Sequence, residues 1–255
     1  MSFGQVLPYL EEAVRLGVKE FYFTGGEPFI NPELPKILEA TLRIGPATVL
    51  TNATLFSPEL VNRLAAMRDA SRYSLELRVS IDGFSPETND PIRGPGTFKR
   101  AMRGVKLLLD VGLLPIITAM RSWPINQDEA QLARFKNSLA EIGYRHPRIK
   151  LLPSLKIGQE ALRDRGYSEY DYITKSMMIG YDSSQLMCSN SRIVSTRGVH
   201  VCPILVDQPD AILGTRLSTA REAFEIGHQA CVTCYQYGAL CANASSVAAR
   251  FEDAF

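Results

Sequence analysis

Residues 1–187 of this 255-residue chain contain no cysteine, because all five cysteines lie at or beyond Cys188. That part of the chain therefore has no thiolate with which to hold a metal ion or an iron-sulfur cluster. A long apolar run is also missing. The most apolar stretch, residues 111–120, contains Pro115 and is far shorter than the roughly 20 residues that span a bilayer. We therefore expect no membrane helix.

An excess of charge of one sign is absent too. Lys and Arg total 28, Asp and Glu total 27, and the net charge is +1. This balance provides no strong field for nucleic acid or an anionic membrane, so we expect neither as a partner. The sequence does not begin with a basic region, an apolar run and a cleavage site, so we expect a cytoplasmic protein. In that compartment clustered cysteines favour metal ligation over disulfides.

What the chain does contain is an alternation of apolar, strand-like runs with segments of helical periodicity. Strands are expected at residues 21–23, 48–50, 75–81, 114–119 and 148–152. Helices are expected at residues 6–16, from Asn31-Pro32, from Ser57-Pro58, at 97–110 and at 127–142. The pattern predicts an α/β fold with a parallel sheet of five β units. After Pro153 the segments become short and polar, so we predict two domains, residues 1–155 and 156–255.

The first expected strand ends in the sequence Thr24-Gly25-Gly26-Glu27-Pro28. Two glycines at the carboxyl end of a strand let the backbone approach a ligand closely, and Glu27 can accept hydrogen bonds from an ammonium group. The alternative is an ordinary turn into a helix, in which Glu27 merely suits the helix N-terminus.

Polar residues also follow the next two expected strands. Thr51 and Asn52 follow the second strand, and Ser80 and Asp82 end the third. The carboxyl ends of parallel strands are where α/β proteins place their ligand groups. Arg93 lies beyond the third strand in a loop rich in glycine and proline, where its guanidinium could clamp a carboxylate. Turn chemistry and a solvated arginine are the alternatives.

Taken in order, these motifs resemble those of a radical S-adenosylmethionine (SAM) enzyme with a C-terminal SPASM or twitch iron-sulfur extension. The resemblance covers most of the chain. It implies a TIM-like (β/α)6 barrel, here a partial one without its first strand, followed by a small cysteine-rich domain. It also implies that Gly25, Gly26 and Glu27 hold the methionine amino group of SAM.

The resemblance assigns the remaining motif residues to the same cofactor. Thr51 and Asn52 match the end of the family's third strand, and Ser80 with Asp82 matches the Ser-x-Asp-Gly that faces SAM. Arg93 matches a loop arginine that meets the SAM carboxylate or ribose region. No catalytic residue is assigned.

One family element has no counterpart. The Cys-x3-Cys-x2-Cys loop that holds the SAM-cleaving [4Fe-4S] cluster should follow the first strand and directly precede the helix with which this sequence opens. We therefore expect Met1 to be an internal methionine of a longer reading frame, or the gene to be a decayed fragment. We also expect the chain as written to be inactive.

The cysteines of the second domain form a separate pattern. Cys188 and Cys202 flank an expected hairpin over residues 192–201, which would bring their thiols together. Cys231 and Cys234 have the Cys-x2-Cys spacing that clasps one metal centre in zinc and iron-sulfur sites. Four thiolates could complete a site, and spacing alone does not separate zinc from iron-sulfur.

Two further residues stay open as ligands. Cys241 lies seven residues after Cys234, and His228 lies three before Cys231, so either could replace one thiolate or bind nothing. A buried free cysteine also packs like a small hydrophobe. The family resemblance implies one auxiliary [4Fe-4S] cluster of the twitch type, with zinc as the alternative.

The resemblance finally implies an activity. A SAM-derived 5′-deoxyadenosyl radical would abstract hydrogen from a peptide or small-molecule substrate, with flavodoxin or ferredoxin as electron donor. The alternative is a non-catalytic iron-sulfur or zinc protein that serves as an electron relay or interaction module.

Overall fold

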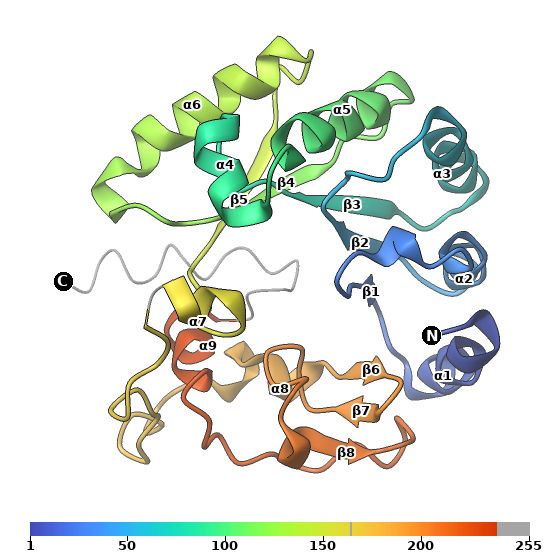
Figure 1. Ribbon diagram of the computed structural model, residues 1–255. Coiled ribbons are helices and arrows are strands. Elements are labelled where there is room, and N and C mark those ends of the chain that lie inside the picture. The colour runs from blue at the N-terminus through green and yellow to red at the C-terminus, as the bar shows by residue number, and fades with distance from the viewer. Residues whose placement is uncertain (164, 239–255) are drawn as a thin grey trace. The chain divides into compact units, whose positions relative to one another are not determined.

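The computed structural model describes residues 1–163 and 165–238. The chain divides into two compact units, Met1–Leu152 and Pro153–Phe255. The first unit is built around a parallel sheet, and the second contains a small antiparallel sheet with short helices (Figure 1).

The sheet of the first unit has five parallel strands in the order β1-β2-β3-β4-β5. Its strands are β1 (Phe21–Phe23), β2 (Ala47–Thr51), β3 (Leu75–Ser80), β4 (Ile116–Met120) and β5 (Arg148–Leu152). The helices are α1 (Phe3–Leu16), α2 (Leu34–Thr41), α3 (Pro58–Ala70), α4 (Pro86–Arg93), α5 (Thr97–Asp110) and α6 (Asp128–Glu141), with 3-10 turns η1 (Pro28–Ile30) and η2 (Ile125–Gln127). The predicted α/β class with five β units is confirmed.

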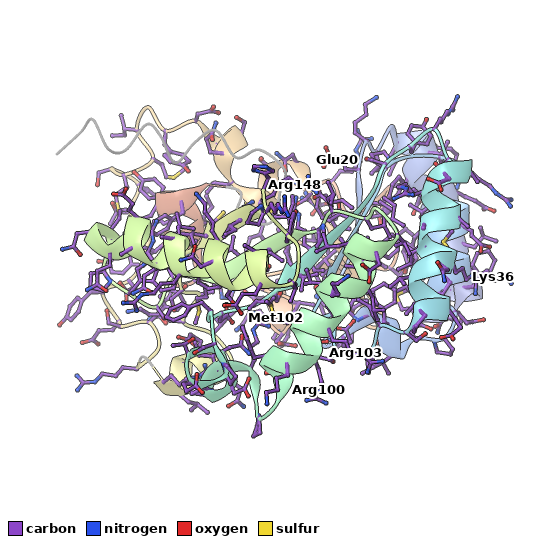
Figure 2. The ribbon with its side chains drawn as sticks, turned by 90° about the horizontal axis from the view of Figure 1, so that it is seen from above. Glu20, Lys36, Arg100, Met102, Arg103 and Arg148 are labelled. Carbon is purple, nitrogen blue, oxygen red and sulfur yellow. The ribbon has the colours of Figure 1, made fainter. Side chains whose placement is uncertain are left out.

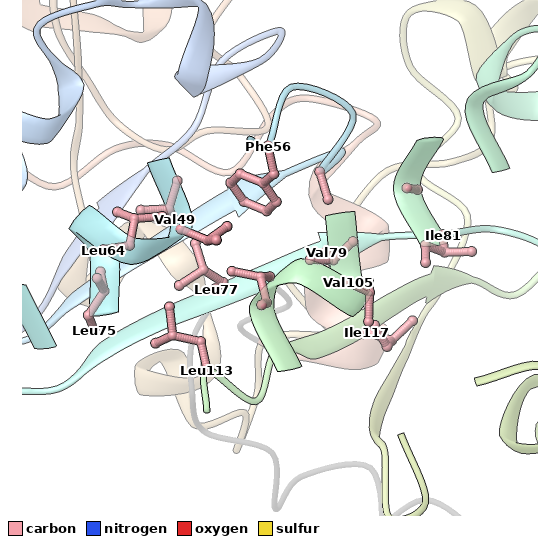
Figure 3. Packing of buried hydrophobic residues seen from close by; sticks show 14 of the residues in the cluster. Val49, Phe56, Leu64, Leu75, Leu77, Val79, Ile81, Val105, Leu113 and Ile117 are labelled. Atoms are coloured by element: carbon pink, nitrogen blue, oxygen red, sulfur yellow. The ribbon is translucent and has the colours of Figure 1, made fainter. Parts of the chain in front are cut away.

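The two faces of β3 differ in polarity. Leu75, Leu77 and Val79 lie on one face and are buried, and Glu76 and the buried Arg78 lie on the other face and form an ion pair at 3.1 Å. The leucines and valine pack with side chains of α3, α5 and β4 in one core (Figure 3). The parallel register Val49↔Leu77 places the buried Val49 of β2 beside the apolar face of β3.

Helices α2, α3, α5 and α6 lie along one side of the sheet (Figure 1). Helix α5 shows why: Met102 is buried in the core, whereas Arg100 and Arg103 point outward (Figure 2). Helices on one side of successive parallel strands are the arrangement of a TIM-like barrel.

Two predicted elements need correction. Arg93 is the last residue of helix α4 and does not lie in a loop. Ser85 caps this helix, Pro86 is its first residue, and Gly94 follows its end with φ 99°. Helix α2 begins at Leu34 rather than at Asn31-Pro32. The Asn31 side chain instead accepts the Glu33 N–H at 3.0 Å and holds the turn after η1.

Gly104 allows α5 to pack directly on the turn that follows β2. A Cβ added at Gly104 would lie 2.1 Å from the carbonyl oxygen of Ala53. We expect Gly104→Ala to lower the free energy of unfolding by about 1–3 kcal/mol, because backbone must move to admit the methyl group. Denaturant unfolding followed by circular dichroism measures the change.

Gly4→Ala is the matched control for that substitution. Gly4 is also helical, in α1, and an added Cβ there meets no atom within 4 Å. This variant should be unchanged or stabilised by up to roughly 1 kcal/mol, since alanine is the better helix former. Equal destabilisation of both variants would contradict the close approach at Gly104.

The second unit contains a three-stranded antiparallel sheet in the order β6-β7-β8. The strands are β6 (Ile193–Ser195), β7 (Gly198–His200) and β8 (Ile212–Gly214), and the helical segments are α7 (Gln159–Arg163), η3 (Ser183–Gln185), α8 (Met187–Asn190), η4 (Pro209–Ala211) and α9 (Cys231–Tyr237). Strands β6 and β7 form the hairpin expected from the sequence; β8 was not anticipated. Among the described residues, no helix has the length and apolar character needed to cross a membrane.

Candidate functional site

A cavity of about 220 Å³ opens in the first unit where β1, β2 and β3 reach their carboxyl ends. Six of the eight residues that the sequence singled out for cofactor binding line it: Gly25, Gly26, Thr51, Asn52, Ser80 and Arg93. The structure therefore gathers motifs from three strands around one hollow. Glu27 and Asp82, the other two, are not among the lining residues.

The two glycines present bare backbone in this cavity. A Cβ added at Gly25 or Gly26 would meet no atom within 4 Å, so packing of the described residues does not exclude a side chain there. Gly25 has φ 158°, a conformation that side-chain-bearing residues rarely adopt. The open space beside both residues is where a ligand could approach the main chain.

Hydrogen bonds of the Glu27 side chain link the end of β1 to the end of β2. Its Oε1 accepts the Thr51 hydroxyl at 2.7 Å and the Phe29 N–H at 3.1 Å, and its Oε2 accepts the Asn52 N–H at 2.7 Å. A carboxylate has about four acceptor positions, so Oε2 keeps one for a further donor. Its contact with the SAM ammonium group stays a prediction.

The turn after β2 is held in an unusual backbone conformation. Ala53 is buried and has φ 57°, in the left-handed region that non-glycine residues seldom occupy. The Thr51 hydroxyl accepts the Ala53 N–H at 3.0 Å, and the Asn52 side-chain oxygen accepts the Thr54 N–H at 2.9 Å. These bonds fix Thr51 and Asn52 at the cavity wall.

Asp82 and Arg93 form an ion pair at the end of β3. The Arg93 Nε donates to Asp82 Oδ2 at 2.5 Å, and Asp82 Oδ1 accepts the Met120 N–H at 2.7 Å. The Asp82 side chain is 3% exposed and that of Arg93 is 35% exposed. Ser80, two residues before, lies 3.4 Å from the Thr118 hydroxyl.

Sequence reasoning missed several residues of the wall, and these are Thr24, Leu50, Thr54, Asn89, Thr97 and Ala101. Asn89 is buried and donates to the Thr97 hydroxyl at 3.1 Å, which joins α4 to α5. The neighbouring Asp90 accepts the Phe98 N–H at 2.9 Å, and this backbone bond lowers the pKa of the Asp90 carboxyl. In the sequence, Ser85-Pro86 is a typical helix start and could have predicted α4, the helix that carries Asn89.

The second unit gathers four thiols. Cys202 and Cys234 belong to one buried apolar cluster, and Cys188 and Cys231 pack against it. The Met187 N–H donates to Cys234 Sγ at 3.4 Å and so links α8 to α9. None of these four cysteines forms a disulfide.

Burial, together with smaller contributions from the neighbouring Cys202, Cys188 and Cys234, raises the pKa of the Cys231 thiol to about 12. Burial also raises the pKa of Cys188. Cys231 and Cys188 are therefore protonated at neutral pH, and the four thiols are close enough to influence each other. Within the described parts of the chain, no three or more His, Cys, Asp or Glu side chains are arranged to hold a metal ion.

His228 and Cys241 were the two further candidate metal ligands. The Nε2 of His228 lies 2.8 Å from Asp210 Oδ2, and its ring stacks on Phe224 with 6.0 Å between ring centroids. One ring nitrogen of His228 is thus engaged by a carboxylate. Cys241 lies outside the described residues.

Comparison with known proteins gives the following relationships. The family profile of the Radical SAM superfamily matches residues 1–135. The AdoMet-dependent heme synthase of Methanosarcina barkeri is 36% identical over 102 residues, which are 39% of this chain and 28% of that protein. Mycofactocin maturase MftC of Mycobacterium tuberculosis is 32% identical over 113 residues, 44% of this chain and 28% of that protein. The matches thus span less than a third of these relatives.

Solved structures share the fold. The structure of anSMEcpe with bound AdoMet has a TM-score of 0.62 at 16% identity and covers 88% of this chain and 72% of that one. Another structure of anSMEcpe, with AdoMet and the Cp18Cys peptide, has a TM-score of 0.58.

Proposed function

The chain belongs to the radical SAM superfamily, and from this membership we propose that the cavity at the carboxyl ends of β1, β2 and β3 binds SAM. The observation that carries the proposal is the convergence of Gly25, Gly26, Asn52 and Arg93 on one hollow. Ligands of α/β sheets bind outside the carboxyl ends of the strands.

The residues of the cavity suit the charged and polar groups of SAM. Bare backbone at Gly25 and Gly26 admits the methionine end of the ligand, and the spare acceptor position on Glu27 Oε2 suits its ammonium group. The Arg93 guanidinium suits its carboxylate. These residues bind and orient the cofactor and hold it against the sheet.

Bound SAM would supply the 5′-deoxyadenosyl radical chemistry of this family, which removes hydrogen from a substrate and depends on a reduced [4Fe-4S] cluster. Residues 1–152 contain no cysteine. These residues can therefore bind SAM, but they provide no thiolate to hold the iron-sulfur cluster that cleaves SAM. The proposed role of the first unit is binding and orientation of SAM.

We propose a peptide or a small molecule as the substrate class. Support comes from the names of the relatives, a heme synthase and a mycofactocin maturase, and from the anSMEcpe structure with a bound peptide. The whole proteins differ in substrate, so the chemistry shared by all of them is the SAM-dependent part. Flavodoxin or ferredoxin would serve as electron donor.

We further propose that Cys188, Cys202, Cys231 and Cys234 hold one auxiliary [4Fe-4S] cluster. Four thiols in one apolar cluster have the donor set of such a cluster, and metal binding would draw them together and release their protons. A structural zinc site with four cysteine ligands has the same donors and is the alternative. It would make the second unit a stabilised interaction module rather than an electron relay.

Thermal unfolding in the presence of SAM tests the proposed function. A ligand that binds the folded state at one hundred times its Kd adds about 2.7 kcal/mol of stability, so saturating SAM should raise the Tm of the full chain. Gly26→Val should have a Tm near that of the wild type without ligand, because its side chain enters open space. The SAM-dependent rise should be lost. A wild-type Tm that does not respond to SAM would contradict the proposal.

A further inference from the structure

Both carboxylate oxygens of Asp82 accept hydrogen bonds from protein donors, and Asp82 is not among the residues that line the cavity it was expected to face. One of its oxygens accepts the Arg93 Nε at 2.5 Å and the other accepts the backbone N–H of Met120 at 2.7 Å. With a side chain that is 3% exposed and absent from the cavity wall, Asp82 has no open path to a ligand there.

Arg93 is held by one nitrogen only. Its Nε donates to Asp82, and none of the described residues accepts a hydrogen bond from its two outer nitrogens, Nη1 and Nη2. Arg93 lines the cavity. A guanidinium fixed through Nε keeps a planar pair of donors that matches a carboxylate in bidentate geometry.

The backbone around this pair is fixed by close packing. The Asp82 N–H donates to the side-chain oxygen of buried Asn89 at 3.0 Å. A Cβ added at Gly83 would lie 2.4 Å from the Asn89 backbone nitrogen, so glycine is required for α4 to approach the end of β3 this closely. Helix α4, which carries Arg93, is thereby set relative to Asp82.

We propose that Asp82 is a positioning residue that acts through Arg93. Its carboxylate fixes Nε and directs the two outer nitrogens into the cavity, where they bind the carboxylate of the ligand. This inference rests on the proposed function for the identity of the ligand, SAM. It assigns Asp82 an indirect role where the family resemblance implied that it faces SAM.

Two ligands that differ only in the carboxylate test this role, SAM and decarboxylated SAM, titrated calorimetrically into the full chain. In Asp82→Asn the amide oxygen can still accept the Met120 N–H, while the amide NH2 is a donor and cannot hold Arg93 Nε. The affinity for SAM should fall roughly tenfold and the affinity for decarboxylated SAM should stay within about twofold. Arg93→Lys should give the same pattern.

The double variant completes the cycle. Asp82→Asn in the Arg93→Lys background should weaken SAM no further, because the two residues act as one unit. Equal weakening of both ligands by Asp82→Asn, or full retention of SAM affinity, would overturn the positioning role alone. A wild-type chain that binds neither ligand would overturn the proposed function and this inference with it.

Discussion

Cys234→Ala is expected to abolish iron binding by the second unit. After anaerobic reconstitution the wild-type chain should contain about four iron and four acid-labile sulfide per chain, whereas the variant should contain close to none. Cys234 is buried in the cluster that holds the other thiols and accepts the Met187 N–H, so its loss removes a ligand from the centre of the site. Reconstitution with iron and sulfide should raise the Tm of the wild type and leave that of the variant unchanged, because metal binding and folding of such sites are coupled.

Val232→Ala is the matched control, since it shortens a side chain on the same turn of α9 without removing a thiol. It should retain the full iron content. Stoichiometric zinc without sulfide in the wild type would contradict the cluster and favour the structural zinc alternative. Normal iron and sulfide in Cys234→Ala would show that the four thiols are not the ligand set.

Glu27→Gln is expected to lower the affinity for SAM by roughly ten- to a hundredfold. The substitution removes the negative charge proposed to meet the SAM ammonium group, and a hydrogen bond to a charged group is among the stronger ones. In the wild-type protein the two Glu27 oxygens accept the Thr51 hydroxyl and the Asn52 N–H. The glutamine NH2 is a donor and replaces one of these oxygens, so one of the two hydrogen bonds is lost and the cavity wall is disturbed. Calorimetric titration with SAM measures the loss.

Glu33→Gln is the control for loss of a carboxylate in the same unit. Glu33 Oε2 accepts the Phe3 N–H at 2.8 Å, and Glu33 does not line the cavity. Its SAM affinity should equal that of the wild type. If both variants bound SAM as tightly as the wild type, Glu27 would be a turn residue and not a cofactor ligand.

The sequence predicted the sheet well because each strand carries its own signal. In β3 the residues of one face are apolar and those of the other are polar, and Thr97–Asp110 forms a helix with the expected bounds. The strand ends then follow from topology, since carboxyl ends of parallel strands share one edge. That is why motifs separated by many residues could be predicted to meet in one cavity.

Tertiary contacts decide what the sequence left open. Helix α4 contains Pro91 and few apolar residues, so its pattern resembled a loop, and Asn89 went unnoticed as the link from Asp82 to Thr97. The interior position of Asp82 depends on the Met120 N–H of the next strand, which no local motif reveals.

The central claim, that SAM binds at the carboxyl ends of β1, β2 and β3, is tested most directly by a backbone amide NMR titration of the full chain with SAM. We predict that chemical shifts change at residues 24–26, 51–54 and 93–97, which contain eight of the twelve residues of the cavity wall, and not at β6 and β7 of the second unit. Absence of shift changes, or changes confined to residues 165–238, would contradict the account.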